Sequence, residues 1–212
     1  LLRIAILRFL AVSLKVPREY HSNPRDLLSR IQQQIKRPIP GERFPKIVIF
    51  TSFTATCKEI ADNLAKIFGK KAIASHETGK SADDVEASLH RFKTEPHCFI
   101  LVCDRSAEAG VNLQFIDWLV HFDLPWFPNQ LEQRLGRVDR IGSKMGVQFC
   151  LFAGPDLPES PHEAWYQVLK DGFDIFNKSI SSLQFYADEK LLKLEEKLFT
   201  EGAKGLSSEI AS

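Results

Sequence analysis

Three arginines in one short segment are the side chains of this sequence best suited to phosphate chemistry. Arg134, Arg137 and Arg140 follow one another at intervals of three residues. This spacing can project their guanidinium groups to one side of a helix and the turn that follows it. A guanidinium group is planar and always charged, so it can pair with two oxygens of a polyphosphate. An arginine placed on a γ-phosphoryl group can accelerate its transfer roughly 10³- to 10⁵-fold.

The same spacing has a second interpretation, which is a charged helix face in solvent. Glu132 and Asp139 lie among the arginines and could pair with them on such a face. The spacing alone does not choose between a phosphate site and a solvated face. The surrounding residues, and the elements that position the arginines, have to decide.

Composition predicts one substantial domain with an appendage, and it limits how the chain can bind nucleic acid. The chain has 212 residues, of which 44% are hydrophobic, and a formal net charge of +1. A protein that bound nucleic acid only through bulk charge would be strongly basic. Any contact with nucleic acid must therefore be local.

The cysteines and the N-terminal residues indicate a cytosolic chain that does not enter a membrane. The four cysteines are spaced singly, as neither a metal pair nor a disulfide framework would be, and most lie in apolar runs that predict core packing. Arg3, Arg8 and Lys15 interrupt the apolar run of residues 1–16, which we expect to form a buried helix. Because the chain begins with leucine, we also expect it to be part of a larger protein.

Alternating apolar runs and amphipathic segments predict a parallel sheet with helices on both faces. The expected strands cover residues 47–50, 71–75, 99–102, 118–122 and 147–152. Helices are expected over residues 54–68, from a cap at Ser81 with Asp84 three residues later, and from Gln130 onward. In such sheets a ligand binds at the carboxyl ends of the strands, so the segments after each strand are where chemistry is expected.

Helical segments flank this predicted sheet domain. Residues 24–36 have the pattern of an amphipathic helix, and the prolines of residues 38–45 form a linker. Two further helices are expected over residues 162–178 and 187–199. We therefore divide the chain into N-terminal helices with a linker (1–45), an α/β domain (46–155) and a C-terminal helical appendage (156–212).

Four sequence motifs give the chain a resemblance to a known family. Residues 133–142, with Gln133, Gly136-Arg137 and Arg140-Ile141-Gly142, resemble motif VI of superfamily 2 helicases in its Swi/Snf-type form. Residues 109–114 resemble motif V, residues 121–128 the stretch joining motifs V and VI, and residues 47–53 motif IV, which opens the second RecA-like lobe. Residues 165–176 further resemble the bacterial RapA-like branch, whose ATPases act on stalled RNA polymerase, and related bacterial defence ATPases.

The resemblance implies a RecA-like fold and a role for each matching residue. Arg137 and Arg140 would be the catalytic arginine fingers. Arg140 is favoured as the main one, but the sequence does not decide between the two. The residues that would contact or sense the nucleotide are Gly110, Asn112, Gln133 and Gly136. The residues that would contact nucleic acid are Thr51, Ser52, Arg105 and Ser106. Residues 104–110 would sense nucleotide and DNA together, and Asp123 and the loop at Trp126 would orient that segment.

Some alternatives stay open beside these implied roles. Thr51 and Ser52 could instead cap the helix that begins at Thr54. Trp126 could stack on bases, whereas Trp118 and Trp165 are expected in the core. Ala109 and the Trp126-Phe127-Pro128 stretch depart from the common form of the family's motifs.

The chain lacks the phosphate-binding half of an ATP site. It contains neither a GxxxxGK[ST] loop nor an acidic box that would hold Mg²⁺. In the family these parts lie on the first RecA-like lobe, so ATP with Mg²⁺ would be held mainly there and this fragment would be inactive alone. The partners implied are that first lobe, double-stranded DNA, and RNA polymerase or another DNA-bound complex, in the nucleoid of the cytoplasm and with no membrane.

The resemblance implies an ATP hydrolase that translocates on double-stranded DNA and remodels protein–DNA or transcription complexes. A lobe of a strand-separating DNA or RNA helicase is one alternative. A docking module without catalytic activity is another, in which the motif arginines only hold the lobe interface.

Overall fold

The computed structural model describes residues 14–15, 44–108, 110–138, 147–152, 160–176 and 184–210. Its contacts divide the chain into two compact units. Leu1–Asp123 with Gly136–Phe152 make up the first unit, and Leu124–Leu135 with Ala153–Ser212 make up the second. No helix among the described residues is long and apolar enough to cross a membrane.

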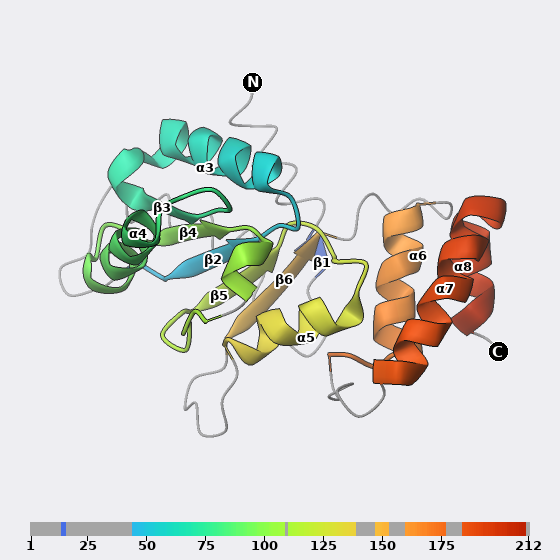
Figure 1. Cartoon of the computed structure of the whole chain (residues 1–212). Helices are drawn as coiled ribbons and strands as arrows, with labels where there is room; N and C mark the ends of the chain where they lie inside the picture. Colours follow the sequence, from blue (N-terminus) through green and yellow to red (C-terminus); the bar gives the residue numbers. More distant parts are fainter. Residues whose placement is uncertain are drawn as a thin grey trace. The chain divides into compact units, whose positions relative to one another are not determined.

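A mainly parallel sheet is the framework of the first unit (Figure 1). Its strands within the described residues are β1 (Leu14–Lys15), β2 (Ile47–Phe50), β3 (Ile73–His76), β4 (Ile100–Cys103), β5 (Trp118–His121) and β6 (Gln148–Phe152). The spatial order is β1-β6-β5-β2-β4-β3, with β2 to β6 paired in parallel and β1 antiparallel to β6. The predicted α/β fold with a parallel sheet is confirmed.

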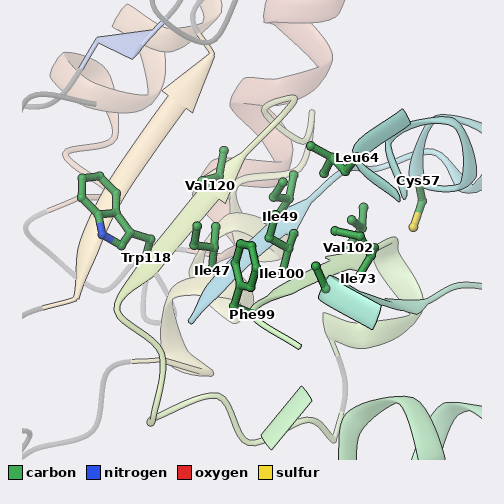
Figure 2. Packing of buried hydrophobic residues seen from close by; sticks show 11 residues of the cluster. Ile47, Ile49, Cys57, Leu64, Ile73, Phe99, Ile100, Val102, Trp118 and Val120 are labelled. Atoms are coloured by element: carbon green, nitrogen blue, oxygen red, sulfur yellow. The ribbon is translucent and has the colours of Figure 1, made fainter. Parts of the chain in front are cut away.

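Alternating side chains of the central strands build a core on each face of the sheet. On one face Ile47, Ile49, Val102 and Val120 pack with α3 (Thr54–Phe68), which contributes Cys57 and Leu64 among others (Figure 2). The intervening residues point to the opposite face and are also fully buried: Val48, Phe50, Leu101 and Leu119. Strands that are buried on both faces explain the continuous apolar runs in the sequence.

The two helices of the first unit begin and end largely where the sequence predicts. α3 ends at Gly69, whose φ of 91° is easily reached only by glycine. α4 (Ala82–Thr94) is capped by Ser81, whose hydroxyl accepts a hydrogen bond from the Asp84 amide at 3.2 Å. The strand expected to begin at Lys71 begins instead at Ile73, because a 3₁₀ turn, η1 (Lys70–Ala72), precedes it.

The second unit is helical. It contains α5 (Pro128–Gly136), α6 (Pro161–Gln167), the π-helical turn η3 (Val168–Gly172), α7 (Gln184–Glu201) and α8 (Ala203–Ile210). Leu131 of α5 packs with Trp165, Leu169 and Leu206 in one hydrophobic cluster. The helix predicted over residues 162–178 is shorter, because α6 and η3 together end at Gly172. The helix predicted over residues 187–199 lies within α7, and α8 is an additional helix.

The N-terminal expectation is wrong where the structure describes it. Leu14 and Lys15 were expected in a buried helix, but they form β1 and pair with Phe152 and Leu151 of β6. A strand at this position pairs the free edge of β6, whose backbone groups a helix would leave unpaired. The rest of residues 1–43 lies outside the described residues, including the helix expected over 24–36.

Candidate nucleotide and nucleic-acid site

Segments that follow parallel strands meet at the carboxyl edge of the sheet, as expected for a ligand site. Thr51 and Ser52 follow β2, and Asp104 follows β4. The Thr51 amide donates to the carbonyl of Cys103 at 2.9 Å, and the Asp104 amide donates to the carbonyl of His76 at 3.0 Å. Backbone hydrogen bonds thereby join the carboxyl ends of β2, β3 and β4.

Asp123, two residues after β5, holds the two hydroxyl residues predicted to contact nucleic acid. The Thr51 hydroxyl donates to Oδ2 of Asp123, and the Ser52 hydroxyl and amide donate to Oδ1 at 2.6 and 2.8 Å. Thr51 is fully buried and Ser52 is partly exposed. A hydroxyl has one proton, so each can meet a phosphate as a donor only after it leaves Asp123. Neither caps α3, whose N-cap residue is Phe53 and has no side-chain cap bond.

Asp104 accepts four hydrogen bonds at this edge. Oδ1 accepts the Ser106 amide and hydroxyl at 2.9 and 2.6 Å, and Oδ2 accepts the Thr54 hydroxyl and the Thr78 amide, both at 2.7 Å. Asp104 is fully buried, whereas its neighbour Arg105 is exposed. Of the residues predicted to contact nucleic acid here, Arg105 therefore offers its charge to solvent, and Ser106 is bound to a carboxylate.

These bonds fix the charge of Asp104. Burial by itself would raise the pKa of the carboxyl group, but the hydrogen bonds from Ser106, Thr78 and Thr54 overcome that effect and lower the pKa to about 2. The group is therefore an anion near neutral pH. It has no ion-pair partner among the described residues, and hydrogen-bond donors alone satisfy it.

Motif V and motif VI are joined by Arg137. Its Nε–H donates to the carbonyl oxygen of Glu108 at 2.7 Å, and its own carbonyl accepts the Leu113 amide at 3.2 Å. Glu108 ends the 3₁₀ turn η2 (Arg105–Glu108), which follows β4. The Arg137 side chain is partly buried. The predicted finger is thus anchored on the segment predicted to sense the nucleotide.

Gly110 and Asn112 border an open pocket in the same region. Gly110 has a φ of 84°, and a Cβ added there would meet no atom within 4 Å, so the backbone conformation and not crowding explains the glycine. The Asn112 side chain accepts the Gln114 amide at 3.2 Å and is exposed. The pocket has a volume of about 250 Å³, and its wall is completed by Glu86, Leu89, His90 and Lys93 of α4 together with Val111, Leu113 and Phe115.

The arginines of motif VI do not all have the same environment. Arg134 is fully buried on α5, on the same helix face as Leu131, so it is not available to an incoming phosphate. Gln133 and Gly136 are exposed. Arg140, the expected main finger, lies outside the described residues, and its role stays a prediction.

One face of the Trp126 ring is covered by another aromatic ring. It stacks on Trp165 with ring centroids 4.4 Å apart and an interplanar angle of 28°, and the Trp165 indole donates to the carbonyl of Pro125 at 3.0 Å. Trp165 is buried, as predicted, and so is Trp118. Base stacking by Trp126 would have to use the other face of its ring.

Sequence reasoning named Asp104 only as the start of a sensing segment and did not find its four donors. The available signal was an aspartate directly after a fully apolar strand run, at the edge where ligands bind. Among the described residues no group of three or more His, Cys, Asp or Glu side chains could hold a metal ion.

The family model described as "Helicase conserved C-terminal domain" matches residues 28–142, more than half of the chain. The chain belongs to the helicase C-terminal domain family. RNA polymerase-associated protein RapA of Pseudomonas putida is 32% identical over 154 residues, which cover 71% of this chain and 16% of that relative. The predicted assignment to a superfamily 2 helicase C-terminal lobe close to the RapA branch is confirmed.

Solved structures show the fold of this helicase C-terminal lobe. The Sulfolobus solfataricus SWI2/SNF2 ATPase core in complex with dsDNA has a TM-score of 0.56 at 20% identity, covering 86% of this chain and 35% of that one. The C-terminal part of the Fun30 ATPase domain has a TM-score of 0.53 at 18% identity, covering 83% and 55%. The predicted RecA-like fold is confirmed. The helicase C-terminal lobe spans only about one sixth of the length of its RapA relative, 16%.

Proposed function

We propose that this chain is the second motor lobe of an ATP-dependent, Swi/Snf-type translocase on double-stranded DNA. ATP with Mg²⁺ is held mainly by a first RecA-like lobe, which supplies the hydrolytic chemistry when joined to this one. The complex that is remodelled is RNA polymerase or another assembly bound to DNA in the bacterial nucleoid. The relationship to a protein named RNA polymerase-associated supports this choice.

The anchoring of Arg137 on Glu108 is the observation that carries the proposal. A guanidinium group has five N–H donors, and the bond to the Glu108 carbonyl uses one of them. The other donors can pair with phosphate oxygens while the anchored Nε keeps the side chain in place. Preorganised charge of this kind stabilises the negative charge that develops during phosphoryl transfer. A merely solvated arginine would need no such anchor.

The other residues divide between the two ligands. Gly110, Asn112, Gln133 and Gly136 meet or sense the nucleotide, and Arg140 provides a second finger. Thr51, Ser52, Arg105 and Ser106 meet the DNA backbone, where phosphate contacts fix position without reading sequence. Binding through phosphates makes the affinity fall with salt and gives little sequence preference. Closure on ATP and opening after hydrolysis then move the pair of lobes along the duplex.

Turnover of the complete polypeptide that carries this chain tests the proposal. ATPase rates are measured with and without double-stranded DNA for the wild type, Arg137→Ala and Arg140→Ala. We expect DNA to stimulate turnover, and at least one substitution to reduce the stimulated rate by about 10²-fold or more. Arg91→Ala is the matched control, because Arg91 is also partly buried and donates to a backbone carbonyl, that of Ile73, at 2.5 Å.

Four outcomes would contradict the proposal. Absence of wild-type turnover, or turnover of both variants at the wild-type rate, would make the lobe a docking module. A loss with Arg91→Ala as large as that with Arg137→Ala would attribute the effect to stability. Strand displacement by the wild-type protein would favour the helicase alternative over translocation.

A further inference from the structure

We propose that Asp104 is a positioning residue that couples the segment after β4 to the segments after β2 and β3, so that movement of one displaces the others. The inference deepens the proposed function and rests on it for its consequence in turnover. The segment after β4 carries η2, whose last residue, Glu108, holds Arg137. The segment after β2 carries two of the predicted DNA contacts, Thr51 and Ser52. A shared carboxylate would connect the two.

The donors to Asp104 come from three separate parts of the chain. Thr54 lies 50 residues before it, at the start of α3, and Thr78 lies 26 residues before it, between β3 and α4. Ser106 lies 2 residues after it, in η2.

Half of this arrangement is an ordinary local turn. An aspartate that accepts the amide and hydroxyl two residues ahead forms an Asx-type turn, which many loops use. Such a turn needs only Oδ1. The bonds from Thr54 and Thr78 to Oδ2 are not part of the turn. They join it to the segments that follow β2 and β3. This second half of the arrangement is what the proposal explains.

The coupling follows from burial of a charge that has no counter-ion among the described residues. Asp104 is fully buried and its low pKa keeps it ionised. Its four hydrogen-bond donors therefore stabilise the charge in place of water. Loss of any donor from a buried carboxylate is costly, because the remaining lone pair cannot be solvated. When nucleotide moves η2, the carboxylate follows Ser106, and the Thr54 and Thr78 segments must follow the carboxylate.

Asp104→Asn tests the inference in the complete polypeptide. An amide side chain has one acceptor oxygen and one NH₂ group, so either orientation places a backbone N–H against the NH₂ group and forces the hydroxyl on that side to turn from donor to acceptor. We expect amide hydrogen exchange to rise about tenfold or more in the segments of both Thr78 and Ser106. We also expect the ratio of DNA-stimulated to DNA-free ATPase turnover to fall about tenfold. Asp117→Asn is the control, because Asp117 accepts the Lys46 amide at 2.7 Å just before β5.

A second pair of variants separates coupling from a simple loss of stability. Thr54→Val removes one donor to Oδ2 and keeps the shape of the side chain, and Thr54→Ser restores the hydroxyl. Coupling predicts that Thr54→Val raises exchange in the Ser106 segment as well as in its own, and that Thr54→Ser does not. This pair decides the question if Asp104→Asn does not fold.

Two results would overturn the inference. One is exchange that rises only in the segment that carries the substitution. The other is an Asp117→Asn variant that reproduces both the exchange pattern and the lowered stimulation ratio. The exchange measurements need neither DNA nor turnover. A wild-type protein without DNA stimulation would therefore refute the proposed function, while exchange would still decide the coupling.

Discussion

Two buried charges lie at opposite edges of the same sheet, and they are satisfied in different ways. At the amino edge, the Lys46 ammonium donates to the carbonyls of Phe92, Glu95 and Cys98 at 2.5, 2.8 and 2.7 Å. At the carboxyl edge, Asp104 accepts four bonds from amides and hydroxyls. Both side chains are buried, so neither can rely on water.

The difference lies in what the partners can do. The partners of Lys46 are backbone carbonyls in the short connection from the end of α4 to β4, and the ammonium also lies 5.2 Å from the centre of the Phe92 ring. A lysine there satisfies carbonyls that a helix end leaves unpaired. Asp104 is bound instead by residues of segments that are expected to meet ligands. We infer that the amino edge is a fixed clamp and that the carboxyl edge can rearrange.

Lys46→Ala should have the largest effect on stability, because it removes the clamp. Three carbonyls would lose a charged donor at once, which should lower the free energy of unfolding by roughly 3 kcal/mol. Urea unfolding monitored by circular dichroism measures this change, with the exposed Lys58→Ala on α3 as control. The KM for ATP of the folded protein should stay at the wild-type value. If Lys46→Ala lowered the free energy of unfolding no more than Lys58→Ala does, Lys46 would not be a clamp.

Asp104 should contribute a smaller, pH-dependent part of the stability. Its pKa is about 2 in the folded chain and near 3.8 when free, so the unfolded chain binds the proton first as the pH falls. The corresponding stabilisation, about 2 kcal/mol, is fully present above pH ~4 and is lost as the pH falls toward 2. In urea titrations between pH 7 and 2, Asp104→Asn should lack this part of the acid dependence. If the free energy of unfolding had the same pH dependence in the wild type and in Asp104→Asn, this prediction would be contradicted.

Local rules were enough to predict most of the elements around these charges. The spacing of apolar residues predicted α3 over its observed range, and the Ser81–Asp84 pair predicted the start of α4. The apolar runs predicted the strands of the parallel sheet to within about two residues, which is the usual precision of element ends. Each of these signals lies within a few residues of the feature that it predicts.

The partners of the buried charges could not be predicted, because they are distant in the sequence. Lys46 bonds to residues 46 to 52 positions away, and Thr54 lies 50 positions from Asp104. The pairing of Leu14 with Phe152 spans an even longer stretch. The burial of Arg134 was not predicted for a different reason. The helix face that buries Leu131 also buries Arg134, whereas arginine is ordinarily expected in solvent.

The smallest expected effect concerns two buried thiols, each of which lies near one of the two charges. Burial raises the pKa of both Cys57 and Cys98. Near Cys57, the negative charges of Glu77 and Asp104 raise it further, to about 12. Near Cys98, the positive charges of Arg91 and Lys46 oppose the effect of burial.

Alkylation of the folded protein at pH 8, followed by peptide mass spectrometry, should therefore modify Cys98 faster than Cys57. The thiolate is the reactive form, and a higher pKa makes it rarer. Both rates should be far below that of a free thiol, because both side chains are fully buried. Asp104→Asn should narrow the difference by removing one of the negative charges near Cys57. If Cys57 reacts first in the wild-type protein, the carboxyl edge is not the more negative of the two.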